Sequence, residues 1–420
     1  MSDDARLDGL VSGLPGAREW WADHGLLVNG TPERVWGLLD SGDGPRARLA
    51  AAVYRASARV HWDAGPGARR QILALDAARY GDRELAARIT AIPVKGVPDT
   101  QWGVDWAAGA EVDARFRDAM PGHVGLVCAV ATGVVDGRCV AVTGSVDRTV
   151  RVWDLTTGQQ VGKPLTGHTD TVWAVATGVV DGRCVAVTGS VDRTVRVWDL
   201  TTGQQVGKPL TGHTDTVWAV ATGVVDGRCV AVTGSGDETV RVWDLTTGQQ
   251  VGKPLTGHTS SAWAVATEMV NDRPVTITGG IDGTVRVWDL TTGKPVGQPL
   301  TGHDAGVLAV ATRVVDGRPV AVTGSSDLTV RVWDLANGKQ IGPPLQGHTD
   351  WVRTVATGAV DDRPVAVTGS YDKTLRLWDL TTHEPVGKEL VFPEPINAAS
   401  MAGQLVVGFG QEVATMSPLT

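Results

Sequence analysis

The chain has 420 residues, of which 42% are hydrophobic, and a formal net charge of −8. This acidic balance gives no basic surface for nucleic acid or for an anionic membrane. The chain does not begin with a basic segment followed by an apolar run, and no stretch approaches the ~20 apolar residues of a membrane span. The composition therefore predicts a soluble, cytoplasmic protein without nucleic-acid or membrane partners.

Residues 1–92 are rich in alanine, arginine and leucine and predict a small α-helical region. Thr31, Pro32 and Glu33 are an N-cap, a first-turn proline and a first-turn acid, and open a helix over 32–39. Apolar residues at helical spacing predict further helices over 46–60 and 68–80, and Asp82 caps a helix over 84–89. Residues 93–110 contain Pro93 and Pro98 and are expected to form an extended linker.

From residue 111 onward the sequence repeats every 45 residues. A Gly-His pair recurs at His123, His168, His213, His258, His303 and His348. A Trp-Asp pair recurs at Trp153, Trp198, Trp243, Trp288, Trp333 and Trp378. These pairs at fixed offsets resemble WD40 repeats, and the resemblance implies that residues 111–420 form a mainly β, seven-bladed propeller.

Each repeat contains four short segments with a period of two, separated by turn residues. In the second repeat they lie over 171–180, 184–190, 194–200 and 204–210, which predicts one four-stranded antiparallel blade. After the sixth Trp-Asp, three more strands are expected over 396–401, 404–408 and 411–417. Residues 111–120 align with the slot of a fourth strand, because Phe116 matches Val161 and Met120 matches Leu165. We expect them to close a degenerate seventh blade, with a six-bladed ring as the alternative.

Each repeat also contains a histidine, a serine and an aspartate, a combination that could suggest nucleophilic catalysis. Six copies argue against a single active site, and the resemblance to WD40 repeats implies a structural hydrogen-bond network instead. In that network the histidine binds the turn aspartate and the serine bridges to the tryptophan indole. The other members are Ser145, Asp147, Ser190, Asp192, Ser235, Asp237, Asp282, Ser325, Asp327, Ser370 and Asp372. Gly280 replaces the serine in the fourth repeat, which predicts a lost bridge and the least stable complete blade.

The cysteines and the glycine-rich turns give no sign of a cofactor or metal site. Cys139, Cys184 and Cys229 recur 45 residues apart, which indicates a copied repeat instead of clustered metal ligands or disulfide partners. The segment at Gly158–Gly162 lacks the spacing and the Ser or Thr of a phosphate-binding loop. We therefore expect no cofactor, no metal, no catalytic residue and no enzymatic activity.

Comparison of the repeats with one another shows where they vary. Repeats two and three differ only at Val191 against Gly236 and at Arg193 against Glu238. The turn after the second strand, the residues after Gly-His and one position of the first strand vary most, and all three are expected on one face of the ring. The predicted partner-binding face comprises Arg148, Trp173, Arg193, Trp218, Glu238, Trp263, Trp351, Arg353, Tyr371 and Lys373.

Three classes of function remain open from the sequence. The first is a non-enzymatic scaffold that binds an unidentified protein or peptide through the variable face, because Trp, Tyr and Arg dominate binding hot spots. The second rests on residues 50–62 and 69–89, which resemble the segment that joins the nucleotide switch to the propeller in bacterial STAND-type signalling ATPases. That resemblance implies a detached sensor half of a signalling or defence system. The third is an enzyme that uses the central channel.

Overall fold

The computed structural model describes residues 20–39, 45–62, 64–97, 102–108 and 122–418. The chain divides into two compact units, one of Met1–Met120 with Met416–Thr420 and the other of Pro121–Thr415. Within the described part of the chain, no helix is long and apolar enough to cross a membrane.

The first unit begins with short helices whose caps match the sequence. The Thr31 hydroxyl accepts from the backbone N–H of Arg34 at 3.4 Å, and the Asp82 carboxylate accepts from that of Leu85 at 2.8 Å. These caps satisfy donors that a helix start leaves free. The helical elements are η1 (Trp20–Ala22), α2 (His24–Asn29), α3 (Pro32–Leu38), α4 (Pro45–Ala56), α5 (Ala58–His61), α6 (Pro66–Arg79) and α7 (Arg83–Thr90).

Buried arginines of α6 hold the loops of this unit in place. Arg69 donates to the carbonyl of Val28 at 3.2 Å, and Arg70 donates to that of Ile92 at 2.8 Å. Both side chains are almost fully buried, so these bonds replace the water that the guanidinium groups lose. Strand β1 (Trp102–Ala108) follows, and α6 and α7 pack against it.

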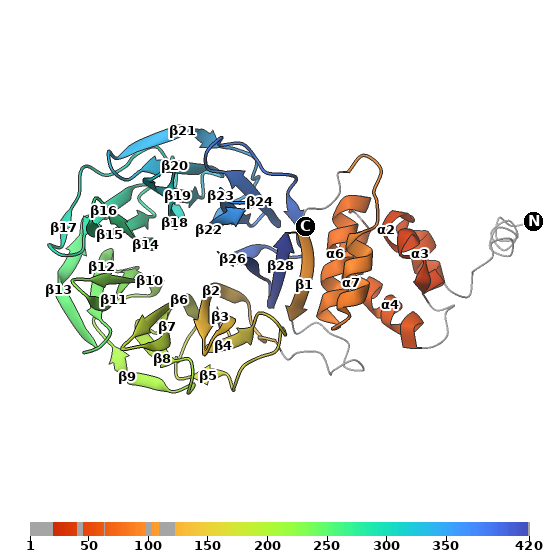
Figure 1. The fold of residues 1–420 in the computed structure, drawn as a ribbon, viewed down its shortest axis with the longest axis horizontal. Coiled ribbons are helices and arrows are strands. Elements are labelled where there is room, and N and C mark those ends of the chain that lie inside the picture. Colours follow the sequence, from red (N-terminus) through yellow and green to blue (C-terminus); the bar gives the residue numbers. More distant parts are fainter. Residues whose placement is uncertain (1–19, 40–44, 63, 98–101, 109–121, 419–420) are drawn as a thin grey trace, which may run out of the picture. The chain divides into compact units, whose positions relative to one another are not determined.

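The second unit is built from four-stranded antiparallel blades arranged in a ring (Figure 1). In the second blade the strands lie within one residue of the predicted segments. The turn between its first two strands places Asp181 and Gly182 at φ 48° and 76°, which is the left-handed conformation that a two-residue hairpin requires. The repeat pattern therefore predicted the strand boundaries to within one residue and the position of the hairpin turn.

The first three blades are β2 (Val127–Val135), β3 (Arg138–Ser145), β4 (Thr149–Asp154) and β5 (Leu165–Thr166); β6 (Val172–Val180), β7 (Arg183–Ser190), β8 (Val195–Asp199) and β9 (Gln205–Leu210); and β10 (Val217–Val225), β11 (Arg228–Ser235), β12 (Thr239–Asp244) and β13 (Gln249–Thr256). The next three are β14 (Ala262–Val270), β15 (Arg273–Gly280), β16 (Val285–Asp289) and β17 (Lys294–Pro295); β18 (Val307–Val315), β19 (Arg318–Ser325), β20 (Val330–Asp334) and β21 (Lys339–Leu345); and β22 (Val352–Val360), β23 (Arg363–Ser370), β24 (Thr374–Asp379) and β25 (Leu390–Val391).

The seventh blade is assembled from both ends of the chain. Strands β26 (Ile396–Ala402), β27 (Gln404–Phe409) and β28 (Glu412–Pro418) supply three strands, and β1 pairs with β28 as the fourth. The Ser417 hydroxyl donates to the Asp105 carboxylate at 2.7 Å across this last pair. The sheet topology confirms seven blades closed by an N-terminal strand.

The position of the closing strand was predicted wrongly. Residues 111–120 lie outside the described part of the chain, and the fourth strand is Trp102–Ala108, within the range predicted as a linker. The prediction assumed that the 45-residue spacing of the copied repeats also applies before the first repeat. In the copied repeats the fourth strand ends only two or three residues before the next Gly-His, as from Leu210 to His213. The connection from β1 to β2 has a different length.

The hydrophobic core lies between neighbouring blades. Valines and leucines of one blade pack on the next, so that Val150 and Leu165 of the first blade share a cluster with Val172 and Trp198 of the second. Strands approach closely at one glycine in each blade. A Cβ on Gly189 would lie 2.6 Å from Val217, so this position admits no larger residue. Each blade therefore buries its core only when a neighbour is present.

A belt of hydrogen bonds joins the first strands of successive blades. The hydroxyl of Thr177 donates to the carbonyl of Thr132 at 2.6 Å, and Thr222 repeats this contact with Thr177 at 2.7 Å. Thr267, Thr312 and Thr357 continue it around the ring. The Thr132 hydroxyl hydrogen-bonds to the Ser400 hydroxyl at 3.0 Å, so the belt also connects the first blade to the seventh.

We expect Thr222→Val to lower the free energy of unfolding by about 1 kcal/mol, because it removes one inter-blade hydrogen bond from an isosteric side chain. Urea unfolding followed by tryptophan fluorescence measures the change. Thr222→Ser keeps the hydroxyl and is the matched control. A loss as large in the serine variant would show that packing, not the hydrogen bond, matters at this position.

Candidate functional site

One threonine in each complete blade connects the histidine to the tryptophan. In the second blade His168 Nδ1 lies 2.8 Å from Asp192, and His168 Nε2 lies 2.8 Å from the Thr188 hydroxyl. The Trp198 indole N–H donates to the same hydroxyl at 2.9 Å. Since the carboxylate only accepts, Nδ1 donates to it, and the threonine hydroxyl accepts from the indole and pairs with Nε2. The histidine and the threonine therefore join the aspartate to the indole in one unbroken chain of hydrogen bonds.

The sequence prediction named the wrong bridging residue. The bridge to the indole is made by threonine, and the serine has a separate role: Ser190 donates to the carbonyl of Asp170 at 3.1 Å and accepts from the backbone N–H of Asp192 at 3.0 Å. The threonine precedes the serine by two residues, so both side chains point to the same side of the strand. The bridging residues are Thr143, Thr188, Thr233, Thr278, Thr323 and Thr368.

The fourth blade keeps this bridge, contrary to the expectation from Gly280. His258 Nε2 lies 2.8 Å from Thr278, and the Trp288 indole donates to Thr278 at 3.0 Å. A Cβ on Gly280 would lie 2.5 Å from the Asp282 carboxylate, which occupies the space of the missing side chain. The fourth blade therefore does not lose the bridge whose absence was expected to make it the least stable.

Hydrogen bonds shift the ionisation of the turn aspartates. Burial alone raises the pKa of Asp237, but hydrogen bonds from His213 and Thr239 together outweigh it and hold the pKa well below its usual range. Asp147, Asp192, Asp327 and Asp372 share this shift and its causes. Burial lowers the pKa of His123 and of His258, which favours the neutral rings that the bridge uses.

The variable turns and the loops before the first strands meet on one face of the ring. The backbone N–H of Val191, in the turn after β7, donates to the carbonyl of Thr171 at 3.0 Å, just before β6. In the third blade the backbone N–H of Gly236 makes the same contact with the carbonyl of Thr216 at 2.9 Å. Arg148, Arg193, Glu238 and Lys373 lie exposed in these turns. These turn residues therefore lie on one face of the ring, as the antiparallel topology requires. We call it the variable face.

Every first strand carries a β-bulge next to this face. The register shifts at one residue between Val172 and Ala174, and at the equivalent place in the other six blades. A bulge leaves one residue unpaired and redirects its side chain. The seven bulge residues line a cavity of about 190 Å³ in the central channel: Cys128, Trp173, Trp218, Trp263, Leu308, Arg353 and Asn397. We call these seven the channel mouth.

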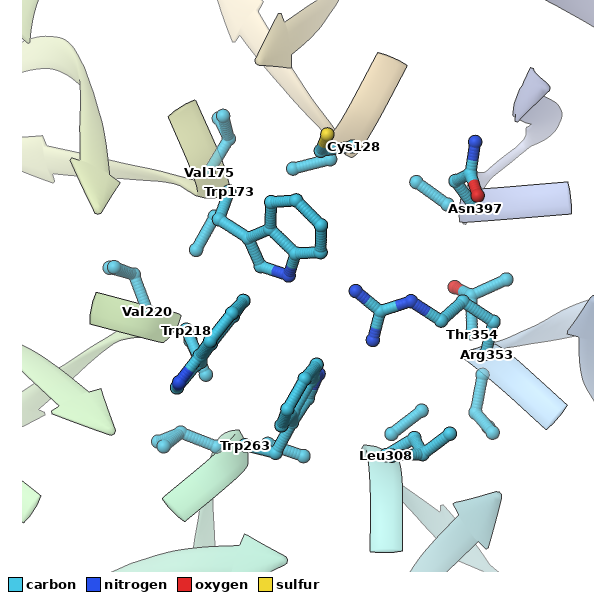
Figure 2. Close-up of a pocket in the computed structure, with 18 of the residues that line it drawn as sticks. Cys128, Trp173, Val175, Trp218, Val220, Trp263, Leu308, Arg353, Thr354 and Asn397 are labelled. Atoms are coloured by element: carbon cyan, nitrogen blue, oxygen red, sulfur yellow. The ribbon is translucent and has the colours of Figure 1, made fainter. Parts of the chain in front are cut away.

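Three tryptophans and one arginine fill the channel mouth (Figure 2). The Trp218 and Trp263 rings stack with centroids 4.1 Å apart, and Trp173 meets Trp218 edge to face at 5.1 Å. The Arg353 guanidinium lies 5.3 Å from the centroids of both Trp173 and Trp263. Arg353 is only 9% exposed and faces the Tyr371 phenol. The cluster is therefore a cation held between aromatic rings.

The structure brings some of the predicted face residues together and separates others. Trp173, Trp218, Trp263 and Arg353 converge in the channel mouth, and Trp351 stacks on Tyr371 beside it, with centroids 5.9 Å apart. The turn residues form an outer rim on the same face, where Lys373 donates to the carbonyl of Pro393 at 2.9 Å.

The predicted site omitted three members of the channel mouth. Cys128 and Leu308 occupy the variable strand position, and the spacing alone would have included them. Asn397 belongs to the seventh blade, which lacks Gly-His and Trp-Asp, so no repeat marker pointed to it. Burial raises the pKa of the Cys128 thiol to about 11, which keeps it protonated. Over the described ranges, no three His, Cys, Asp or Glu side chains form a group that could hold a metal.

The ring of four-stranded blades with a repeated Asp–His–Thr–Trp chain defines a β-propeller of the repeat-protein class. The family model described as WD domain, G-beta repeat matches residues 115–154, 158–199, 203–244, 248–289, 293–334 and 338–379. These six segments cover more than half of the chain, which therefore belongs to the WD40 repeat family. No curated protein matches the chain.

We expect Thr233→Val to lower the free energy of unfolding by about 2–4 kcal/mol, because it leaves His213 Nε2 and the Trp243 indole N–H buried without partners. Urea unfolding monitored by circular dichroism measures the loss. Thr233→Ser, which keeps the hydroxyl, should recover most of it. Ser235→Ala should cost only about 1 kcal/mol. An equal loss of stability in Thr233→Val and Ser235→Ala would contradict the assignment of the bridge to the threonine.

Stability should fall in acid in two steps. The lowered pKa values of His123 and His258 mean that the unfolded chain binds more protons below about pH 6.5, so stability declines as the pH falls through that value. The lowered pKa values of the aspartates add a steeper loss below about pH 4. Thermal unfolding between pH 3 and pH 8 measures both. Asp237→Asn should flatten the lower step, whereas Asp226→Asn, in an exposed turn, should leave the profile unchanged.

Proposed function

We propose that the chain is a non-enzymatic recognition module that binds a protein or peptide partner through the variable face. Membership of the WD40 family supports the general class, since these propellers are typically protein-interaction modules. The observation that carries the proposal is the channel mouth, where the bulges of neighbouring blades bring three tryptophans and an arginine into one cluster. Trp and Arg in a central, largely desolvated position are the residues that dominate binding hot spots.

The backbone of the rim turns supports the same face. Arg148, Arg193, Glu238, Leu328 and Lys373 adopt φ between 65° and 71°, a conformation that favours glycine. The fourth blade has Gly283 at this position. A non-glycine residue there costs roughly 1–2 kcal/mol. Five blades carry this cost while their side chains stay exposed, which is consistent with selection for the side chains and not for stability.

The chemistry of the channel mouth supports a binding role over an enzymatic one. Its described lining holds two ionisable side chains, Arg353 and Cys128. The raised pKa of Cys128 disfavours the thiolate that a nucleophile requires. An arginine stays protonated and serves as a hydrogen-bond donor instead of a base. The lining therefore offers positive charge and apolar surface without a general base.

A second candidate is the detached sensor half of a bacterial STAND-type signalling or defence system. It rests on the resemblance of residues 50–62 and 69–89 to the helical segment that precedes the propeller in that group. These residues fall on α4, α5, α6 and α7, and α6 carries buried arginines. On this proposal the partner is a separately encoded effector, and the chain itself has no ATPase activity.

Capture of partners by the immobilised full chain tests the proposed face. A rim variant with Arg148→Gly, Arg193→Gly and Glu238→Gly removes three side chains from turns that already favour glycine, so its fold should be retained. A mouth variant carries Trp218→Ala and Arg353→Ala. We expect a partner captured from native lysate to be lost from the mouth variant and reduced at least tenfold by the rim variant.

The matched control changes two exposed arginines of the opposite face, Arg183→Ala and Arg228→Ala. Circular dichroism and thermal unfolding must first show that all variants fold alike. Loss of the partner from the control, with retention by the rim and mouth variants, would contradict the proposal and assign binding to the opposite face. ATP hydrolysis by the purified chain would contradict the sensor candidate.

A further inference from the structure

We propose that the channel mouth binds a carboxylate, supplied by a Glu or Asp side chain that a protein partner inserts beside Arg353. This inference rests on the proposed function, because it names the group that the variable face recognises. It follows from the donors that the mouth leaves unused, from the absence of an acid in its lining, and from the size of its cavity.

The channel mouth contains donors without acceptors. The indole nitrogens of Trp173 and Trp263 are buried and have no hydrogen-bond partner. Figure 2 shows both nitrogens turned toward the middle of the cluster, where the Arg353 guanidinium lies. An unpaired buried N–H costs about 1–3 kcal/mol, and the face of a neighbouring ring compensates only weakly. An oxygen anion placed among these groups would satisfy both indoles and the guanidinium.

The charge at the channel mouth selects an anion over a cation. Aromatic clusters commonly bind cations, but Arg353 already lies against the faces of Trp173 and Trp263 and would repel a second positive charge. None of the described residues that line the mouth is an aspartate or a glutamate. The ionisable groups that face Arg353 are the Tyr371 phenol and the Cys128 thiol. Arg353 is thus a largely buried cation without an acidic partner in the lining.

The size of the cavity selects a single side chain. Its volume of about 190 Å³ is smaller than the roughly 300–1,000 Å³ of sites that enclose a whole small ligand. Below the cluster the lining is apolar, with Val175, Val220 and Val265 from successive blades. A short acidic side chain that enters from the variable face places its carboxylate at the level of the donors, above this apolar lining. The planar guanidinium pairs with a carboxylate through two parallel hydrogen bonds.

Entry of the side chain requires the tryptophans to change rotamer. All three indoles are only partly buried, and such changes without backbone movement are common at interfaces. Trp218 is the ring whose nitrogen is turned away from the middle in Figure 2. Its N–H therefore offers no hydrogen bond to the carboxylate. This difference among three chemically equal residues provides an internal control.

The test uses the full chain labelled with 5-fluorotryptophan and two blocked peptides, acetyl-Ala-Glu-Ala-amide and acetyl-Ala-Gln-Ala-amide. Fluorine NMR follows the resonances of Trp173 and Trp263, which single Trp→Phe variants assign. We expect the glutamate peptide to shift both resonances in a saturable way and to bind at least tenfold more tightly than the glutamine peptide. Equal binding of the two peptides, or binding of neither, would overturn the proposal.

Variants then locate the carboxylate. Arg353→Gln should weaken binding of the glutamate peptide at least tenfold, and Arg353→Lys, which retains the charge without the planar fork, should weaken it less. Trp173→Phe and Trp263→Phe keep an aromatic ring and lose the N–H, so each should weaken binding about fivefold. Trp218→Phe removes an N–H that is turned away from the middle of the cluster, so it should weaken binding less than either of these two variants. Equal losses for all three phenylalanine variants would show that ring packing, not hydrogen bonding, holds the peptide.

A third arm separates a partner's side chain from a free small carboxylate. Sodium acetate should displace the glutamate peptide only at concentrations at least tenfold above the peptide's own dissociation constant. Acetate that binds as tightly as the peptide would assign the site to a small metabolite. These outcomes are independent of the capture experiment. A partner lost from the mouth variant, together with a failed peptide titration, would leave the recognition face standing and reject only the carboxylate.

Discussion

The propeller depends on one threonine hydroxyl in each complete blade. Thr188 stands between a histidine and a tryptophan that are both nearly buried, and it is the group that satisfies both ring nitrogens. The histidine in turn fixes the turn aspartate, whose carboxylate accepts from the backbone after Gly-His. One short chain of hydrogen bonds thereby ties the innermost loop, the second strand and the third strand together. These groups lie outside the channel mouth and hold the loops of the variable face in place.

The division between constant and variable residues follows from this chain. The bulge residue of the first strand points into the channel, and the αL residue of the turn points to solvent, so neither touches the bridge. The position of Trp173 therefore holds leucine in the fifth blade and arginine in the sixth, while the bridge stays the same in both blades. Six similar blades produce an asymmetric mouth because the bulge residue differs among them. Asymmetry of this kind is what a specific ligand requires.

Some parts of the molecule could be predicted from the sequence and others could not. The strand boundaries of the repeats, such as 184–190 predicted for β7 (Arg183–Ser190), were predictable because copied segments share one period and one set of turn residues. The bridging Thr188 was not identified, since five of the six repeats have both Thr and Ser two residues apart and the pattern does not say which hydroxyl meets the indole. Asn397 and the true position of β1 escaped because the seventh blade has no repeat markers. The unpaired indoles could only be seen in three dimensions.

The bulge at the start of each first strand has an evolutionary consequence. A duplicated or exchanged 45-residue segment brings its own bulge residue and turn residues together with its own Asp–His–Thr–Trp chain. Recombination among nearly identical segments, such as those of the second and third blades, would therefore rewrite one sector of the mouth and leave the remaining sectors and the fold unchanged. The number of segments is constrained more strictly, because β1 and β28 must still meet to close the ring. The lining of the mouth can thus change sector by sector, whereas the number of sectors is fixed.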